Sequence, residues 1–212
     1  MWFPKVHILG PDGEIEIIAW NGGMGAGISN HFLAGMVAYF GWGGVLSHVA
    51  LDIIIARLLG RKVGHFEAAK LEVEMAKWIA CGRGPIYMNL MYMLHIFEQS
   101  VWGAIAGGVD GLIVGAGLPL DLPRVVAEAK RSLGVKREIA LIPIVSSVRA
   151  FKAICRKWWR SYRCLPDAVV LEGPLAGGHL GFKTTDNLDD SSFQLEFLLK
   201  ELLGEMPSIM EE

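Results

Sequence analysis

A histidine set among glycines is the side chain of this sequence best suited to chemistry. His179 lies in the segment 172–181, Glu-Gly-Pro-Leu-Ala-Gly-Gly-His-Leu-Gly, directly after the apolar run 167–171. Such a run is typical of a buried parallel strand, so the segment would leave the carboxyl end of that strand. An imidazole exposed there can act as an acid or base near neutral pH. A merely solvated histidine is the alternative, and the neighbouring glutamate and glycines argue against it.

Three further segments contain residue types that could contact a ligand. Two are glycine-rich loops, 21–27 and 115–119, and each follows an apolar run. Glycines let backbone N–H groups approach a ligand closely, although a tight turn without a ligand explains each loop equally well when taken alone. The third segment contains Asn89, whose amide must find hydrogen-bond partners, either a backbone carbonyl or the polar edge of a cofactor. The candidate residues in these segments are Gly22, Gly23, Met24, Asn89, Gly115 and Gly117.

The elements that position these segments alternate along the chain. Amphipathic helical segments separate apolar runs centred near Ile18, Val45, Met88, Ile113, Ile142 and Val170. This alternation predicts a parallel sheet, either doubly wound or closed as a barrel, and most runs are spaced close to the ~31 residues per unit of an eightfold β/α barrel. The candidate segments follow strands or end them, so they would share the end of the sheet where both folds place their sites. At the start of the chain, segments 5–9 and 14–18 flank Gly-Pro-Asp-Gly and predict a β-hairpin.

The sequence also predicts the apolar faces of four helices and the first residues of three of them. Ser29-Asn30, Asp121 and Ser146-Ser147 are placed to begin three of them. The inward apolar faces predicted in chain order are Leu33, Val37 and Phe40; Leu122, Val126, Ala129 and Leu133; Val148, Phe151, Cys155 and Trp158; and Phe193, Phe197, Leu199 and Leu203.

Composition limits the class of protein. The 212 residues are 52% hydrophobic and 20% charged, with a net charge of −2, which excludes a disordered chain and allows one sizeable core. Three cysteines are too few for a disulfide scaffold and fit a reducing, cytoplasmic compartment. No signal peptide is evident, and glycines and asparagines interrupt the uncharged stretch 17–51, so we expect no membrane span.

Two other patterns in the sequence have simpler interpretations than a binding site. The basic segment 149–163 interleaves six arginines and lysines with aromatic residues, as nucleic-acid-binding segments do. The overall charge is negative, however, and the segment is typical of one amphipathic helix with a solvated face, so we expect no nucleic-acid partner. The cysteines and histidines lack the spacing of a zinc site, so no metal site is predicted.

Together, the loops 21–27 and 115–119, Asn89, the stretch 143–147 and the segment 172–181 resemble the nitronate monooxygenases, formerly called 2-nitropropane dioxygenases. The flavin-dependent enoyl-acyl-carrier-protein reductases share this pattern. The similarity runs from about residue 15 to the end of the sequence, and Gly-Gly-His-Leu-Gly is its most specific part. The resemblance implies a TIM-type (β/α)8 barrel with non-covalent FMN at the carboxyl ends of its strands.

The resemblance also implies a role for each candidate residue. His179 matches the acid or base of the family, and Asn89 would contact the edge of the isoalloxazine ring. The other cofactor-binding residues would be Gly22, Gly23, Met24, Gly115, Gly117, Glu172, Gly177 and Gly178. The implied reaction is oxidation of an alkyl nitronate or nitroalkane by O2 to a carbonyl compound and nitrite, in which FMN does the redox work.

Only six strand–helix units are evident, whereas a closed barrel has eight. We therefore expect residues 1–212 to form a single FMN-binding domain, C-terminally truncated, that lacks the last two units and has open sheet edges. Because those units hold the phosphate of FMN in the family, we expect this chain alone to bind FMN weakly or not at all. Two alternatives stay open: an NAD(P)H-dependent enoyl-thioester reductase on the same scaffold, and an inactive barrel fragment that folds by pairing with another chain. A homodimer is compatible with the leading interpretation.

Overall fold

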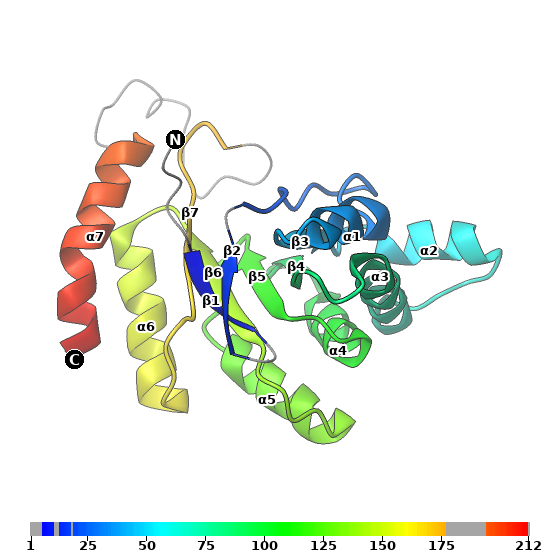
Figure 1. Cartoon of the computed structure of the whole chain (residues 1–212). Coiled ribbons are helices and arrows are strands. Elements are labelled where there is room, and N and C mark those ends of the chain that lie inside the picture. Colours follow the sequence, from blue (N-terminus) through cyan, green and yellow to red (C-terminus); the bar gives the residue numbers. More distant parts are fainter. Residues whose placement is uncertain (1–5, 11–12, 18, 177–193, 212) are drawn as a thin grey trace.

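A parallel sheet forms the centre of the chain (Figure 1). The computed structural model describes residues 6–10, 13–17, 19–176 and 194–211. The parallel strands are β3 (Gly44–Ser47), β4 (Ile86–Met91), β5 (Gly111–Gly115), β6 (Ala140–Val145) and β7 (Val170–Leu171), and they pair in chain order. An isolated parallel bridge between Trp20 and Gly43 extends the sheet beyond β3. Strand order without a reversal is that of a barrel rather than of a doubly wound sheet, so the predicted incomplete barrel is confirmed.

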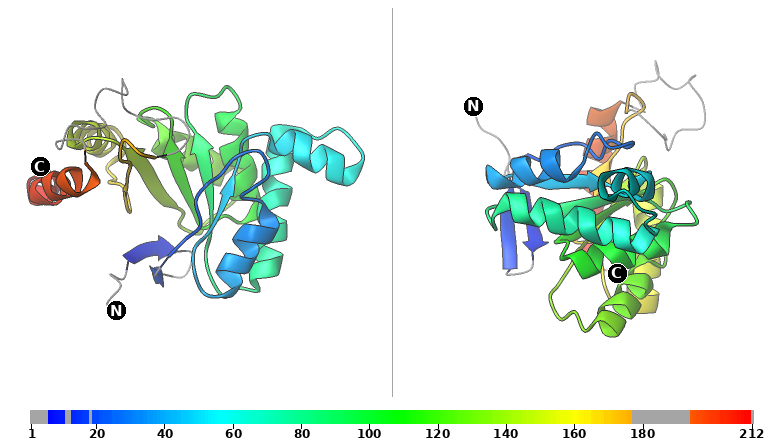
Figure 2. Two further views of the ribbon diagram at one scale, coloured as in Figure 1. Left: turned by 90° about the horizontal axis from the view of Figure 1, so that it is seen from above. Right: turned by 90° about the vertical axis from the view of Figure 1, so that its right-hand side faces the viewer.

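Five of the six apolar runs predicted as strands, those from Val45 to Val170, form the parallel strands. Ile18, the centre of the first run, lies outside the described residues, and Trp20 close to it makes only the single bridge. The predicted hairpin is confirmed as β1 (Val6–Gly10) and β2 (Gly13–Ile17), an antiparallel pair that forms its own sheet. Figure 2 shows this hairpin set apart from the strands of the parallel sheet.

Helices precede, connect and follow the parallel strands and cover one face of their sheet (Figure 2). They are α1 (His31–Tyr39), α2 (Leu51–Leu59), α3 (His65–Ala80), α4 (Phe97–Gly107), α5 (Leu122–Leu133), α6 (Val148–Tyr162) and α7 (Leu195–Glu211). The sequence interval between β3 and β4 is the longest because it holds both α2 and α3. Within the described ranges, every helix is too short or too polar to cross a membrane.

Both faces of the parallel sheet are buried, as the uninterrupted apolar strands require. Leu46, Met88 and Leu112 pack against the helices in the larger hydrophobic cluster. The residues that alternate with them belong to a second cluster on the opposite face, which we call the inner face: Val45, Tyr87, Ile113, Ala140 and Ile142. The ring of Trp20 meets that of Tyr87 edge to face, with centroids 5.7 Å apart. The inner face corresponds to the interior of a barrel.

The predicted faces of α5 and α6 agree with the structure. Val148, Phe151, Cys155 and Trp158 of α6 are all buried, and α5 buries Leu122, Val126 and Ala129, with Leu133 half-buried. Asp121 precedes α5 but makes no side-chain capping bond, whereas Ser147 caps α6 by accepting from the Ala150 N–H. The basic segment of α6 lies partly against α7, where Lys152 Nζ is 2.6 Å from Glu205 Oε2.

The predicted faces of α1 and α7 are wrong. Helix α1 buries Ala34, Gly35 and Ala38, whereas Phe40 is 69% exposed. The reason is close packing on α3, because a Cβ atom on Gly35 would lie only 2.7 Å from Ile79 Cβ.

Helix α7 buries Leu198 and Leu202 and exposes Phe197, Leu199 and Leu203. It packs mainly against α6 and β7, which cover only a narrow strip of its surface. Phe193, the first residue predicted for this face, lies outside the described residues.

A buried carboxylate ties the sheet to α3 at the amino ends of the strands. Asp110 is 1% exposed and accepts the backbone N–H of Ile86 at 2.6 Å. Both of its oxygens also lie 2.8 Å from Lys77 Nζ. Because every interaction of Asp110 requires its negative charge or an acceptor oxygen, this group stabilises the fold at the end opposite the candidate site.

Candidate active site

The candidate residues gather at the carboxyl ends of the parallel strands, where the loops 21–30, 92–96, 116–121 and 172–176 leave the sheet. We call this end of the sheet the mouth. Asn89 lies there on β4, two residues after Tyr87, and so faces the same inner side. Its neighbours in the sheet register are Ser47 of β3 and Ile113 of β5. The Asn89 side chain is half-buried, and none of the described residues forms a hydrogen bond with its amide. That amide is therefore available to a ligand at the mouth.

The glycine-rich loop 21–27 folds back onto Asn89. A Cβ atom on Gly23 would overlap the amide of Asn89, so only glycine fits at this position. The buried Ser29 holds the loop closed, because its hydroxyl donates to the Gly22 carbonyl at 2.6 Å and accepts from the Met24 N–H at 2.9 Å. Of the candidate residues, Gly23 and Asn89 are thus the pair that the fold brings into contact.

Asn21, which begins this loop, is used by the fold itself. Its Oδ1 accepts the Val45 N–H at 2.8 Å, and its Nδ2 donates to the Val45 carbonyl at 2.7 Å. The side-chain amide thereby pairs with the backbone of β3 as a neighbouring strand would. This pairing anchors the start of the loop to the edge of the sheet and leaves the Asn21 amide engaged.

The first backbone N–H groups of α1, which follows the glycine-rich loop, already have hydrogen-bond acceptors within the protein. Asn30 Oδ1 accepts the N–H groups of Phe32 and Leu33 at 3.1 Å, which confirms Asn30 as the cap. The His31 N–H donates to Glu72 Oε1 at 2.6 Å, and His31 Nδ1 lies 3.0 Å from Glu72 Oε2. The first donors of the helix are therefore taken, and the buried carboxylate of Glu72 disfavours an anion there.

The loop after β5 is fixed to the loop after β4. The Tyr92 N–H donates to the Gly115 carbonyl at 2.8 Å, and the Met93 N–H donates to the Ala116 carbonyl at 3.2 Å. Gly117 has φ +127°, and a Cβ atom there would press on Tyr92 and Met93. Gly115 lies on the inner face, in register opposite Met91, whereas Gly117 packs against the neighbouring loop.

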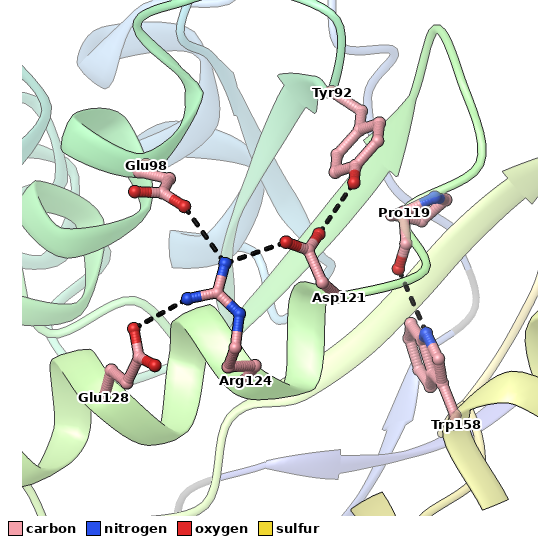
Figure 3. Close-up of polar contacts among 7 residues, drawn as sticks. All are labelled: Tyr92, Glu98, Pro119, Asp121, Arg124, Glu128 and Trp158. Atoms are coloured by element: carbon pink, nitrogen blue, oxygen red, sulfur yellow. Dashed lines mark hydrogen bonds and ion pairs between the residues drawn. The ribbon is translucent and has the colours of Figure 1, made fainter. Parts of the chain in front are cut away.

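A polar network supports both loops from outside (Figure 3). Tyr92 donates its hydroxyl to Asp121 Oδ1 at 2.7 Å, and Arg124 reaches Asp121, Glu98 and Glu128. Burial alone would raise the pKa of Asp121, but the hydrogen bonds from Tyr92 and Arg124 lower it below its usual value. Burial and the bond to Asp121 raise the pKa of Tyr92 to about 12, so this phenol stays protonated.

A buried indole completes the support of the loop after β5 (Figure 3). Trp158 Nε1 of α6 donates to the Pro119 carbonyl at 3.0 Å. The Trp158 side chain is fully buried, so this bond joins α6 directly to the end of the loop. The helix face that the sequence predicts for α6 thus also positions the mouth.

His48 is a residue of the mouth to which sequence reasoning gave no role. It directly follows β3, is 1% exposed, and uses both ring nitrogens. Its Nε2 accepts the Met91 N–H at 2.9 Å, and its Nδ1 lies 3.2 Å from Ser100 Oγ of α4. Burial, with a smaller contribution from His65, lowers the pKa of His48 to about 4, so the ring is neutral at physiological pH. The sequence feature that could have indicated this role is that His48 lies within the otherwise largely apolar, uncharged stretch 17–51.

Glu172 continues the sheet beyond β7. The Glu172 N–H donates to the Val145 carbonyl at 2.8 Å, which extends the ladder of β7 by one residue. Glu172 follows Val170 by two residues, and Val170 packs against the inner cluster, so Glu172 is at an inner-face position. Gly177, Gly178 and His179 lie outside the described residues.

The loops of the mouth also carry exposed apolar side chains. Met24, Ile28, Met93, Leu118 and Leu175 are each at least 40% exposed, and they come from the loops after four different strand positions. Apolar side chains around a few available polar groups are typical of a small-molecule site. In the part of the chain that the structure describes, no cluster of histidine, cysteine and carboxylate side chains could hold a metal ion.

Comparison with known proteins agrees with this arrangement. The family model of nitronate monooxygenase matches residues 13–207. A single-residue variant of FabK from Thermotoga maritima has a similar fold, with a TM-score of 0.55 and 22% identity over 81% of this chain and 47% of that chain. FabK from the same organism gives a TM-score of 0.49 and 23% identity over 84% of this chain and 45% of that chain. No curated protein matches the sequence.

The chain thus spans about half the length of the FabK structures, and at these identities the likeness concerns the fold alone. The family match is of a different kind, because it covers most of the chain and includes every candidate residue of the mouth. This protein belongs to the nitronate monooxygenase family.

Proposed function

We propose that this chain carries the flavin site of an FMN-dependent oxidoreductase that oxidises alkyl nitronates with O2 to a carbonyl compound and nitrite. One observation carries the proposal: the Asn89 amide, beside Gly23 and on the inner face of the mouth, has no partner among the described residues. A half-buried amide without a partner is costly unless a ligand or water satisfies it. The family match supports the choice of a flavin as that ligand.

The residues of the mouth suit the chemistry of a flavin ring. The amide of Asn89 can donate and accept at the polar edge of the ring, and Gly22, where a Cβ would meet only Met24, leaves room for a flat group against the backbone. Gly23 packs on Asn89 and Gly115 on Ile144, so both would contact the flavin through backbone atoms. Met24 and the apolar rim would cover its hydrophobic part. Gly117, Glu172, Gly177 and Gly178 complete the proposed cofactor-binding set. When bound, FMN would supply reversible acceptance of electrons from the substrate.

The protein's own part in the reaction is to bind, orient and move a proton. A neutral nitroalkane must lose a proton from carbon before its anion, the nitronate, can be oxidised. We assign that proton transfer to the imidazole of His179. Tyr92 would not compete for the proton, because its phenol is protonated and already donates to Asp121.

Turnover of the 212-residue chain in the presence of FMN tests the proposal. We expect nitronate and O2 to be consumed without any nicotinamide, and Asn89→Ala to lower the rate by about tenfold through weaker flavin binding. Gln99→Ala is the control, because it removes a side-chain amide from an exposed position on α4, outside the loops of the mouth. NAD(P)H oxidation that requires an enoyl thioester, with no nitronate turnover, would contradict the proposal and indicate a reductase.

A further inference from the structure

At the end of β4, a side chain accepts a hydrogen bond that the backbone of a neighbouring strand ordinarily accepts. The His48 N–H donates to the Asn89 carbonyl at 3.2 Å, which is the last bond of the ladder between β3 and β4. The chain then turns away into α2 through Ala50, which has φ +62°, so β3 offers no further carbonyl to the Met91 N–H. Nε2 of His48 takes that place at 2.9 Å.

This geometry fixes the tautomer of the ring. A backbone N–H can only donate, so the Nε2 that receives the Met91 N–H must carry a lone pair rather than a proton. In a neutral imidazole the proton is then on Nδ1, which donates to Ser100 Oγ at 3.2 Å. Ser100 is itself buried on α4, so a chain of bonds leads from α4 through His48 to β4.

We infer that His48 is a positioning residue that sets the direction of the Asn89 amide at the mouth. Its main-chain and ring nitrogens bind β4 at the Asn89 carbonyl and at the Met91 N–H, and thereby fix the backbone that directly follows the Cα of Asn89. The role rests on the proposed function, since the group that it positions is the proposed flavin contact. It differs from a purely structural role because its effect on a ligand must pass through Asn89.

Two isosteres of histidine separate the contributions of the two ring nitrogens. In His48→Gln the side-chain oxygen can reach the Nε2 position and still accept the Met91 N–H, whereas in His48→Asn it reaches only the Nδ1 position. We expect His48→Gln to keep the FMN affinity within about threefold and His48→Asn to weaken it about tenfold. His7→Asn, the same change on β1 of the separate hairpin sheet, should have no effect.

A double-mutant cycle tests whether the effect passes through Asn89. In an Asn89→Ala background, His48→Asn should cause no further loss of FMN affinity. Equal losses in both backgrounds, or equal affinities of the Gln and Asn variants, would overturn the inference. If His48→Asn does not fold, Ser100→Ala replaces it, because that change frees the ring from α4 and should weaken binding in the same Asn89-dependent way.

Nuclear magnetic resonance of the chain without flavin provides an independent test of the role of His48. We expect the Nδ1–H tautomer of His48, and side-chain amide resonances of Asn89 that shift in His48→Asn but not in His48→Gln. An Nε2–H tautomer would overturn the inference whether or not FMN binds. If the expected resonances are found but no variant binds FMN, the positioning holds and the proposed function fails.

Discussion

Lowering the pH from neutral to about 5 is expected to destabilise the folded protein through His48. Burial, with a smaller contribution from His65, lowers the pKa of this imidazole from 6.5 to about 4. In the unfolded chain the ring gains its proton as the pH falls through about 6.5, whereas in the folded chain it stays neutral down to about 4. The stability associated with the neutral ring is therefore complete above pH 6.5 and is lost between these two values. Linkage gives a loss of about 2 kcal/mol at pH 5 and about 3 kcal/mol at pH 4.

His48→Gln isolates the contribution of His48 to the pH dependence of stability, because the glutamine side chain does not gain a proton in this pH range. Urea unfolding of the wild type and of His48→Gln, each at neutral pH and at pH 5, gives the four free energies required. We expect the difference in free energy of unfolding between the two proteins to change by about 2 kcal/mol, with the wild type losing more. His95→Gln is the matched control and should follow the wild type. A difference that stays constant to within about 0.5 kcal/mol would refute the argument from burial.

Three further predictions concern single substitutions. Gly23→Ala should displace the Asn89 amide and weaken FMN binding about tenfold, whereas Gly204→Ala on α7, where a Cβ would meet nothing within 4 Å, should change it less than about twofold in a fluorescence titration. Asp110→Ala should lower the free energy of unfolding by about 3 kcal/mol in urea, because it leaves a buried N–H and a lysine without their partner; a loss below about 1 kcal/mol would contradict this. His179→Ala should slow turnover of a neutral nitroalkane about 100-fold in an oxygen-consumption assay but spare the preformed nitronate, which needs no proton removed; equal losses on both substrates would argue against a role in proton transfer.

The parallel sheet and its mouth could be predicted from the sequence because local signals mark them. Apolar runs without charges identify the strands, and glycine marks the ends of two of them, at Gly115 of β5 and at Gly173 after β7. The same holds for α6, whose apolar residues recur at helical spacing and whose cap is a serine. In these places the local pattern and the tertiary packing favour the same structure.

Other features depend on contacts that the sequence does not display. The buried face of α1 consists of small residues, because the helix packs closely on α3. The spacing of its large apolar side chains therefore predicted a face that includes the exposed Phe40. His48 owes its role to residues 43 and 52 positions away. Asn21 likewise pairs with Val45 across 24 positions, and nothing in the loop itself indicates that its amide is engaged.

A titration of FMN fluorescence with the 212-residue chain tests most directly whether the mouth binds a flavin. We expect weak but saturable quenching at one flavin per chain, reduced by Asn89→Ala and by Gly23→Ala and unchanged by Gln99→Ala, a change at an exposed position of α4. Quenching that does not saturate, or that is the same for all four proteins, would contradict the assignment of the mouth as a flavin site.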